Sequence, residues 1–177
     1  SYLSVQIVNF DNQAFHAEAQ TSTLSISGNK FKLNGQEKFL VLATYFDGLD
    51  AQNYTADLNY LKSKGFDGIR IMPNWWNWGN NQASNTLIDM NGNVRQDRLN
   101  ILKQIITTTA SLGMVVDVTF TRETVPGSCY NTDQRNGMRY DMMCISDYKR
   151  GVVSVVQSLS NYNNIIYDLQ NEVDGAN

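Results

Sequence analysis

The sequence has little of what builds metal centres and nucleotide sites. Its 177 residues include one histidine and two cysteines, and neither cysteine has a histidine near it, so zinc-type ligand spacing is absent. It has no Gly-x-Ser-x-Gly elbow and no glycine-rich phosphate loop. We therefore expect no metal and no cofactor.

Strong charge and long apolar runs are also missing. The 14 Lys and Arg residues are scattered and the formal net charge is -3, which argues against a phosphate-tracking surface and hence against a nucleic acid partner. No apolar run approaches the roughly 18 residues that span a membrane, so no membrane partner is expected. The N-terminus lacks a basic region followed by an apolar block, and no signal peptide is visible.

The two cysteines, Cys129 and Cys144, lie in one polar stretch. They are compatible with a loop disulfide in a secreted protein, and equally with two unpaired thiols. The sequence leaves both readings open.

What the chain does have is a regular pattern from Leu24 onward. Residues 24–26 and 31–33 alternate apolar and polar side chains, and the Asn34-Gly35 step after them is a strong hairpin signal. Residues 1–23 hold a short alternating stretch and then a polar segment, so we interpret them as a leader or a peripheral strand. The predicted domain covers residues 24–177 and starts with a hairpin.

After the hairpin, short apolar runs alternate with helix-like segments. The runs are residues 39–45, 68–72, 114–120 and 165–169, and the helix-like segments are residues 53–64, residues 97–112 and a third that begins at the capping residues Ser146-Asp147. A long polar loop separates the third run from the third helix. This order predicts parallel strands joined by right-handed crossovers, with both faces of the sheet covered.

Two architectures fit this order, a doubly wound open sheet and a (β/α)8 barrel. The nucleotide-binding open sheet has a glycine-rich turn after its first strand, whereas residues 45–50 contain one glycine, Gly48. We therefore favour an α/β fold of the (β/α)8 TIM barrel type, of which this chain holds about the first four βα units.

Polar and aromatic residues gather directly after each of the four runs. They are Tyr45, Phe46 and Asp47; Asn74, Trp75, Trp76, Asn77 and Trp78; Thr121, Arg122 and Glu123; and Gln170, Asn171 and Glu172. In a parallel α/β barrel, the C-terminal ends of the strands form the rim where active sites lie. This co-location indicates an enzyme.

The rim residues suit a sugar substrate. Trp75, Trp76 and Trp78 offer flat apolar faces, and Asn77 among them offers hydrogen bonds, a combination that fits pyranose rings. We expect at least one indole to line a substrate cleft and at least one to cover the barrel. Tyr45 is a further substrate-binding candidate.

Glu172 is the candidate proton donor. A carboxyl in a partly desolvated cleft has a raised pKa and can donate to a leaving oxygen, while the neighbouring Asn171 can hold a sugar hydroxyl. Retaining glycoside hydrolysis also needs a second carboxylate about 5 Å from the first. For Asp117 and Asp168, which sit within strands, we expect hydrogen bonds or ion pairs inside the barrel rather than catalysis.

Three segments resemble those of clan A glycoside hydrolases, and most closely the cellulase-like glycoside hydrolase family 5. They are residues 31–36, similar to the opening hairpin, residues 65–71, similar to the second strand, and residues 167–172, similar to the fourth strand. The resemblance covers about residues 24–177. It implies that Glu172 is the general acid/base, that Asn171 binds the sugar 2-hydroxyl and that Arg70 supports the nucleophile.

The chain departs from this family in residues and in length. Thr119-Phe120-Thr121 stands where the family usually has a histidine, and Val173 stands where a proline often follows the Asn-Glu pair. Both departures leave the sugar open. The family's nucleophile is a glutamate on the seventh strand, and a whole barrel takes roughly 250 residues.

We therefore expect a fragment that is inactive alone. Its strand residues Ile69, Val116 and Ile166 are predicted to face an unfilled barrel centre. The missing C-terminal half-barrel, or a second chain, would complete the fold.

The predicted function is that of the N-terminal half of a retaining glycosidase. Its substrates would be β-linked poly- or oligosaccharides, as for cellulases and mannanases, and a polymeric substrate favours secretion. One alternative is a carbohydrate-binding barrel that has lost catalysis, which keeps the tryptophans and needs no second carboxylate. Another is an unrelated barrel enzyme in which the Asn171-Glu172 pair is coincidental.

Overall fold

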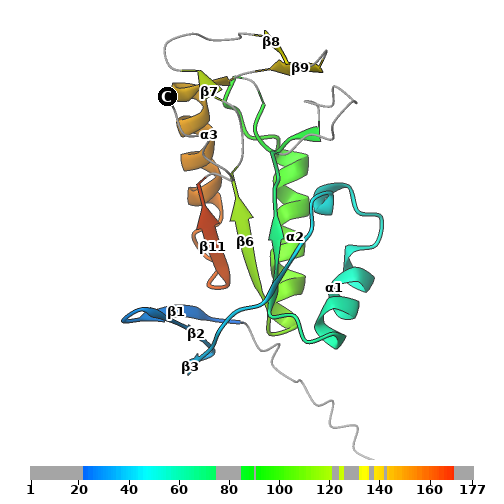
Figure 1. Ribbon diagram of the computed structural model, residues 1–177, viewed down its shortest axis with the longest axis vertical. Coiled ribbons are helices and arrows are strands. Elements are labelled where there is room, and N and C mark those ends of the chain that lie inside the picture. The colour runs from blue at the N-terminus through cyan, green and yellow to red at the C-terminus, as the bar shows by residue number, and fades with distance from the viewer. Residues whose placement is uncertain are drawn as a thin grey trace, which may run out of the picture.

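Four parallel strands form the centre of the computed structural model. They are β4 (Leu42–Thr44), β5 (Gly68–Ile71), β6 (Val115–Thr119) and β11 (Ile165–Asp168), arranged in the order β11-β6-β5-β4. The structure describes residues 22–74, 85–89, 91–120, 124–125, 132–135, 138–141 and 143–169. All four predicted runs contain these strands, so the strand predictions are confirmed (Figure 1).

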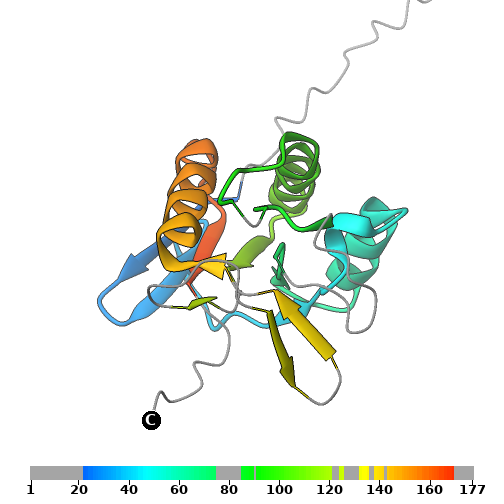
Figure 2. The same ribbon diagram turned by 90° about the horizontal axis from the view of Figure 1, so that it is seen from above.

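The strand order decides between the two architectures. Each strand lies beside the next one in the chain, whereas a doubly wound sheet reverses its order at a switch point. Right-handed crossovers taken in sequence place every connecting helix on the same face. Figure 2 shows α1 (Tyr54–Ser63), α2 (Gln96–Ser111) and α3 (Ile145–Ser158) in an arc along one face of the strands. This is the wall of a partial (β/α) barrel.

Local sequence signals mark both ends of helix α1 and the C-terminal end of helix α2. The Asn53 side chain caps α1 by accepting a hydrogen bond from the Ala56 backbone N–H at 3.2 Å. Gly65 and Gly113, at φ +87° and +70°, lie just beyond the C-terminal ends of α1 and α2. These glycines take the left-handed conformation that ends a helix.

The predicted cap of the third helix is wrong. Helix α3 begins at Ile145, with Cys144 as the N-cap residue and no capping hydrogen bond from a side chain. Cys144 ends strand β10 (Met143–Cys144), so the chain passes directly from a strand into the helix. Asp147 pairs instead with Arg150 one turn later, at 2.6 Å.

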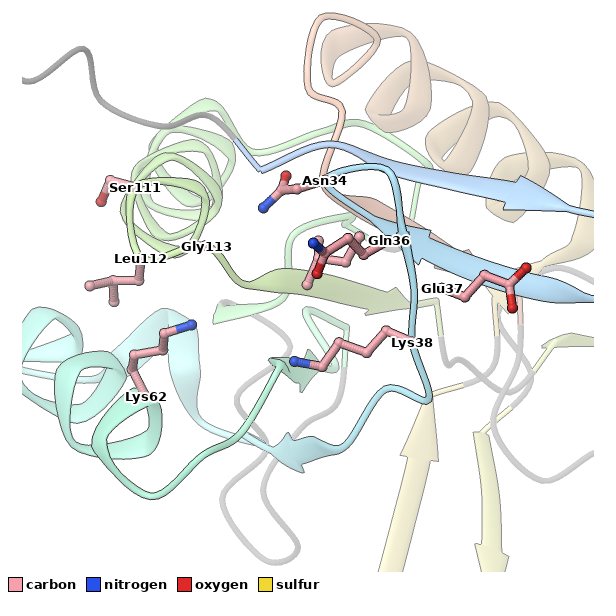
Figure 3. Close-up of a pocket in the computed structure, with 9 residues that line it drawn as sticks. Asn34, Gln36, Glu37, Lys38, Lys62, Ser111, Leu112 and Gly113 are labelled. Carbon is pink, nitrogen blue, oxygen red and sulfur yellow. The ribbon is translucent and has the colours of Figure 1, made fainter.

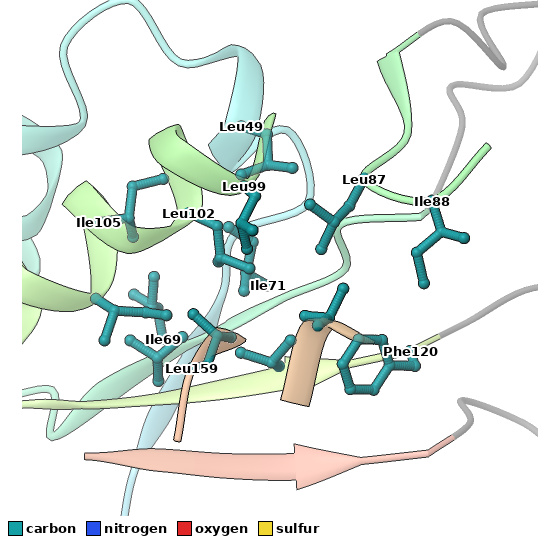
Figure 4. Packing of buried hydrophobic residues seen from close by; sticks show 14 of the residues in the cluster. Leu49, Ile69, Ile71, Leu87, Ile88, Leu99, Leu102, Ile105, Phe120 and Leu159 are labelled. Atoms are coloured by element: carbon teal, nitrogen blue, oxygen red, sulfur yellow. The ribbon is translucent and has the colours of Figure 1, made fainter. Parts of the chain in front are cut away.

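The main core lies between the sheet and the helices (Figure 4). It includes Ile69, Ile71, Val116 and Val118 from β5 and β6, Phe120 just after β6, Leu102, Ile105, Ile106 and Val155 from the helices, and Leu159 at the end of α3. Ile69 and Val116 are fully buried there. The prediction that they face the barrel centre is wrong, because side chains alternate along a strand and these two point to the helices.

Alternation places the neighbours of these residues on the inner face. Arg70 and Asp117 follow Ile69 and Val116, so they point toward the barrel axis. Ile166 is paired with Asp117 in register and shares that face, as predicted. The inner face of the described sheet is therefore largely polar near its C-terminal end.

The N-terminal hairpin is confirmed. Strands β1 (Leu24–Ser27), β2 (Lys30–Leu33) and β3 (Gln36–Glu37) form an antiparallel sheet. Leu33 pairs with Gln36, which leaves Asn34 and Gly35 as a two-residue turn with φ +53° and +79°. Both positive φ values fit the turn that Asn-Gly favours. The hairpin lies at the N-terminal end of the parallel strands (Figure 1).

The polar segment predicted as one long loop contains short strands. Strand β7 (Thr124–Val125) pairs in parallel with β10, and β8 (Thr132–Arg135) forms a hairpin with β9 (Met138–Asp141). A short 3-10 helix, η1 (Gly48–Asp50), was also not predicted.

The leader assigned to residues 1–23 stays a prediction, because residues 1–21 lie outside the described part of the chain. Among the described helices, none has the length and apolar character to cross a membrane.

Gly68 marks a close approach of neighbouring strands in the parallel sheet. A Cβ atom there would lie 2.2 Å from the Val115 carbonyl oxygen and 2.8 Å from Leu42 Cδ2. We expect Gly68→Ala to lower the free energy of unfolding by about 3 kcal/mol, because the clash involves backbone. Chemical denaturation of the protein measures this.

Gly28→Ala is the matched control. An added Cβ at Gly28 meets nothing within 4 Å, and its φ of +62° makes backbone strain the one cost, about 1 kcal/mol. Equal losses in the two variants would contradict the close approach at Gly68.

Candidate active site

Arg70 organises the inner face near the C-terminal ends of the strands. Its Nε donates a hydrogen bond to Thr119 Oγ1 at 2.8 Å, and its Nη2 donates to Asp168 Oδ2 at 2.7 Å. Asp117 Oδ2 lies 3.8 Å from Arg70 Nε. The guanidinium of β5 therefore binds side chains from both β6 and β11.

Thr119 connects the two halves of this cluster. Its hydroxyl accepts from Arg70 and donates to Asp117 Oδ1 at 3.2 Å. The strand register pairs Arg70 with Asp117 and Thr119 with Asp168, so the contacts follow from the ladder itself. The predicted ion pairs of Asp117 and Asp168 inside the barrel are confirmed.

One guanidinium faces two carboxylates, and the two are not held equally. Burial raises the pKa of Asp117, and the hydrogen bond from Thr119 and the charge of Arg70 offset this only in part. The negative charge of Asp168 raises it further. Asp168 has the short contact to Arg70, so Asp117 is the carboxylate with the weaker partner.

The comparisons with known proteins identify the family. The model of the cellulase family, glycosyl hydrolase family 5, matches residues 24–177. The chain belongs to glycosyl hydrolase family 5. No curated protein matches the chain at a significant level.

Three solved enzyme structures share the fold, two of them from family 5. A family 5 glycoside hydrolase from Bacteroides vulgatus superposes with a TM-score of 0.55 and 14% identity, over 90% of this chain and 34% of that one. A β-mannanase from the blue mussel Mytilus edulis gives 0.51 and 16%, over 86% and 46%. A family 5 enzyme from Prevotella bryantii gives 0.50 and 15%, over 77% and 42%. The chain matches less than half the length of each.

Several predicted site residues of this family 5 chain lie outside the described residues. They are Glu172, Asn171, Trp75, Trp76, Trp78 and Cys129. Their predicted roles stay predictions. Cys144, the other cysteine of the possible disulfide, is described and does not carry a free thiol, which favours the disulfide over two unpaired thiols.

The last described residue before the tryptophans is held in place by a buried hydrogen bond. Asn74, which ends the second rim segment before the tryptophans, is buried, and its Oδ1 accepts a hydrogen bond from the Ile88 backbone N–H at 3.0 Å. This bond ties the chain that leaves β5 to the segment that leads into α2. The tryptophans therefore follow a fixed point of the scaffold.

Tyr45, just after β4, makes contacts that stabilise the fold. Its hydroxyl donates to Asp57 Oδ2 in α1 at 2.6 Å, and its ring packs against the main core. Burial, followed by the hydrogen bond to Asp57, raises the pKa of Tyr45 well above its usual range. These contacts join the end of β4 to α1, and the predicted role of Tyr45 in substrate binding stays a prediction.

Tyr148 is a rim residue that the sequence did not reveal. Its hydroxyl lies 2.9 Å from the Phe120 carbonyl oxygen and 2.6 Å from the Leu169 carbonyl oxygen. It therefore bridges the C-terminal ends of β6 and β11. No motif marks it, since its partners are backbone carbonyls far away in the sequence.

The cavity in Figure 3 lies at the other end of the strands. It measures about 550 Å³ and is lined by residues of the hairpin and of the ends of α1 and α2, among them Asn34, Lys62 and Ser111. In (β/α)8 barrels this end serves stability rather than catalysis.

Within the described ranges, no group of three or more His, Cys, Asp or Glu residues could hold a metal ion.

The raised pKa of Asp117 predicts a stabilising variant. The folded state holds a proton on this carboxyl at pH values where the unfolded chain, with a pKa near 3.9, has lost it. The charge therefore opposes folding above the folded-state pKa. We expect Asp117→Asn to raise the free energy of unfolding at pH 7 by up to about 1 kcal/mol, because the amide oxygen can still accept from Thr119.

Denaturation at pH 7 and at pH 3.5 checks this expectation. The gain at pH 7 should become much smaller at pH 3.5, where the carboxyl is largely protonated in both states. A loss of stability at pH 7 would mean that the attraction of Arg70 outweighs burial.

Proposed function

We propose that this chain is the N-terminal part of a retaining glycosidase that cleaves O-glycosidic bonds in β-linked poly- or oligosaccharides. The supporting observation is the family 5 match, which extends through residue 177 and so includes the Asn171-Glu172 pair. This pair follows β11, whose last residue, Asp168, is bound by Arg70. The β-mannanase and the cellulase family name support β-linked glucans or mannans as substrates.

The proposed mechanism is a double displacement. Glu172 protonates the leaving oxygen while a second glutamate attacks the anomeric carbon and forms a glycosyl-enzyme ester. Glu172 then takes a proton from water, which attacks the same carbon and releases the sugar. Asn171 holds the sugar 2-hydroxyl, and indoles among Trp75, Trp76 and Trp78 stack on sugar faces.

Arg70 is proposed to orient the nucleophile. Its guanidinium points toward the barrel axis and is held by Thr119 and Asp168 at 2.8 Å and 2.7 Å. A cation fixed in this way favours the ionised form of a carboxylate beside it. The hydroxyl of Thr119 provides this fixation at the strand end where the family usually has a histidine.

The nucleophile is proposed to lie in a C-terminal half-barrel outside this chain. Strands β4 and β11 each have one neighbour in the described sheet, so both edges are open. Phe39 and Val41, just before β4, are 88% and 48% exposed, as expected of a surface that another part of a barrel covers. The covering half belongs to the same longer protein or to a second chain.

Secretion is part of the proposal. A polymeric substrate is met outside the cell, and Cys144 carries no free thiol. Disulfides persist in oxidising compartments.

The acid/base role of Glu172 is tested in the complete protein. We expect Glu172→Gln to lower kcat on a β-glucan or β-mannan by about a thousandfold, because the leaving oxygen then departs without a proton. An aryl glycoside with an acidic phenol needs less protonation, so its first step should be much less affected. Measured kcat/KM values, which report the first chemical step, give the comparison for the two substrates.

Glu37→Gln is the matched control, because Glu37 is exposed in β3 and pairs with Lys30 at 2.6 Å on the surface. It should keep the parent activity. A parent protein that binds the polysaccharide without cleaving it would favour the non-catalytic alternative, and full activity in Glu172→Gln would refute the proposed mechanism.

The 177-residue chain by itself should show no turnover on the same substrates. The proposed mechanism needs two carboxylates about 5 Å apart, and the second is expected in the other half. Sustained turnover by this chain alone, lost on Glu172→Gln, would overturn the placement of the nucleophile.

A further inference from the structure

The C-terminal end of β11 is held from two sides. On the inner face, Arg70 binds the Asp168 side chain at 2.7 Å. From α3, the Tyr148 hydroxyl lies 2.6 Å from the carbonyl oxygen of Leu169. Two residues follow Leu169 before Glu172, so the bond with Tyr148 lies at the base of the segment that carries the proposed acid/base.

A backbone hydrogen bond and the Tyr148 hydroxyl together hold the C-terminal ends of β6 and β11. The Phe120 backbone N–H donates to the Asp168 carbonyl at 2.7 Å. The next carbonyls along the two strands, those of Phe120 and Leu169, both lie within hydrogen-bond distance of Tyr148. One hydroxyl proton shared between two carbonyls fixes the distance between the strand ends as well as their direction.

We propose that Tyr148 is a positioning residue, which sets the direction in which the chain leaves β11 and thereby places Glu172 for proton transfer. The inference rests on the proposed function. It concerns a residue that touches backbone and not substrate.

Tyr148 is itself a rigid support. It lies in the first turn of α3 and packs against the main core, to which α3 contributes Val152 and Val155. Burial, together with the charge of Asp168, raises the pKa of Tyr148 to about 12. The phenol therefore stays protonated, and able to donate, throughout the pH range of an ordinary glycosidase.

The expected effect is on chemistry more than on binding. A displacement of about 1 Å in a catalytic group can lower the rate about a hundredfold. Removing the hydroxyl leaves the ring in the core but withdraws the donor from both carbonyls. Glu172 would then approach the leaving oxygen less accurately, while the substrate contacts remain.

The test is Tyr148→Phe in the complete protein. We expect kcat on the polysaccharide to fall at least tenfold, with KM within about twofold of the parent, because the misplacement affects the transition state. The loss of kcat/KM, which reports the first chemical step, should be much smaller for the aryl glycoside, and the basic limb of the pH profile should move. In the Glu172→Gln background, Tyr148→Phe should have little further effect on the polysaccharide.

The matched control is Tyr54→Phe. It removes a hydroxyl hydrogen bond to Gln104 Oε1, 3.3 Å long, between α1 and α2 on the outer layer. Its kcat and pH profile should equal those of the parent. All assays are run well below the lowest melting temperature of the set. If Tyr148→Phe does not fold, Tyr148→Met, which fills space in the core and also lacks a donor, takes its place with the same expected losses.

The outcomes separate the two proposals. An inactive parent, or an active Glu172→Gln variant, contradicts the proposed function whatever Tyr148 does. An active parent that depends on Glu172 overturns the inference about Tyr148 in two cases. One is an unchanged kcat and pH profile in the Tyr148 variant, and the other is an equal loss of kcat/KM on both substrates.

Discussion

One face of the parallel sheet carries the apolar core and the other carries the charged residues of the candidate site. The ion pair of Arg70 with Asp168 depends on this alternation of side chains between the two faces. Ile69 and Ile71 point to the helices and are fully buried, so Arg70 between them must point inward. The register then places Asp117 beside it and Asp168 within reach. A shift of one residue in any strand would exchange core and site, so the apolar packing that stabilises the fold also aligns the charged groups.

Much of this arrangement could be predicted from the sequence, because its signals are local. The Asn34-Gly35 turn, the Asn53 cap and the glycines after the helices act within a few residues. The apolar runs located all four strands, but they did not show which face each residue takes. In Val115-Val116-Asp117-Val118 only one polar residue indicates which side chains point inward. This signal is weak within an apolar run, and the predicted inward direction of Ile69 and Val116 is wrong.

The candidate site was predictable only where a side chain carries the signal. Arg70 was found through its family resemblance, and the charges of Asp117 and Asp168 suggested ion pairs. Tyr148 was missed because its partners are main-chain carbonyls, which any sequence provides. The short strands from β7 to β10 were missed because each has only two to four residues within a mainly polar stretch, and their pairing is decided by tertiary context.

The sequential strand order also bears on how the sheet assembles. Leu42 pairs with Gly68, Gly68 with Val115, and Val116 with Ile165, so each new strand needs one loop closure to a strand already in place. The later loops are about twice as long as the first, and doubling a loop adds only about 0.6 kcal/mol of closure entropy. No single addition carries a dominant kinetic penalty, and the wall can grow strand by strand in the order of synthesis.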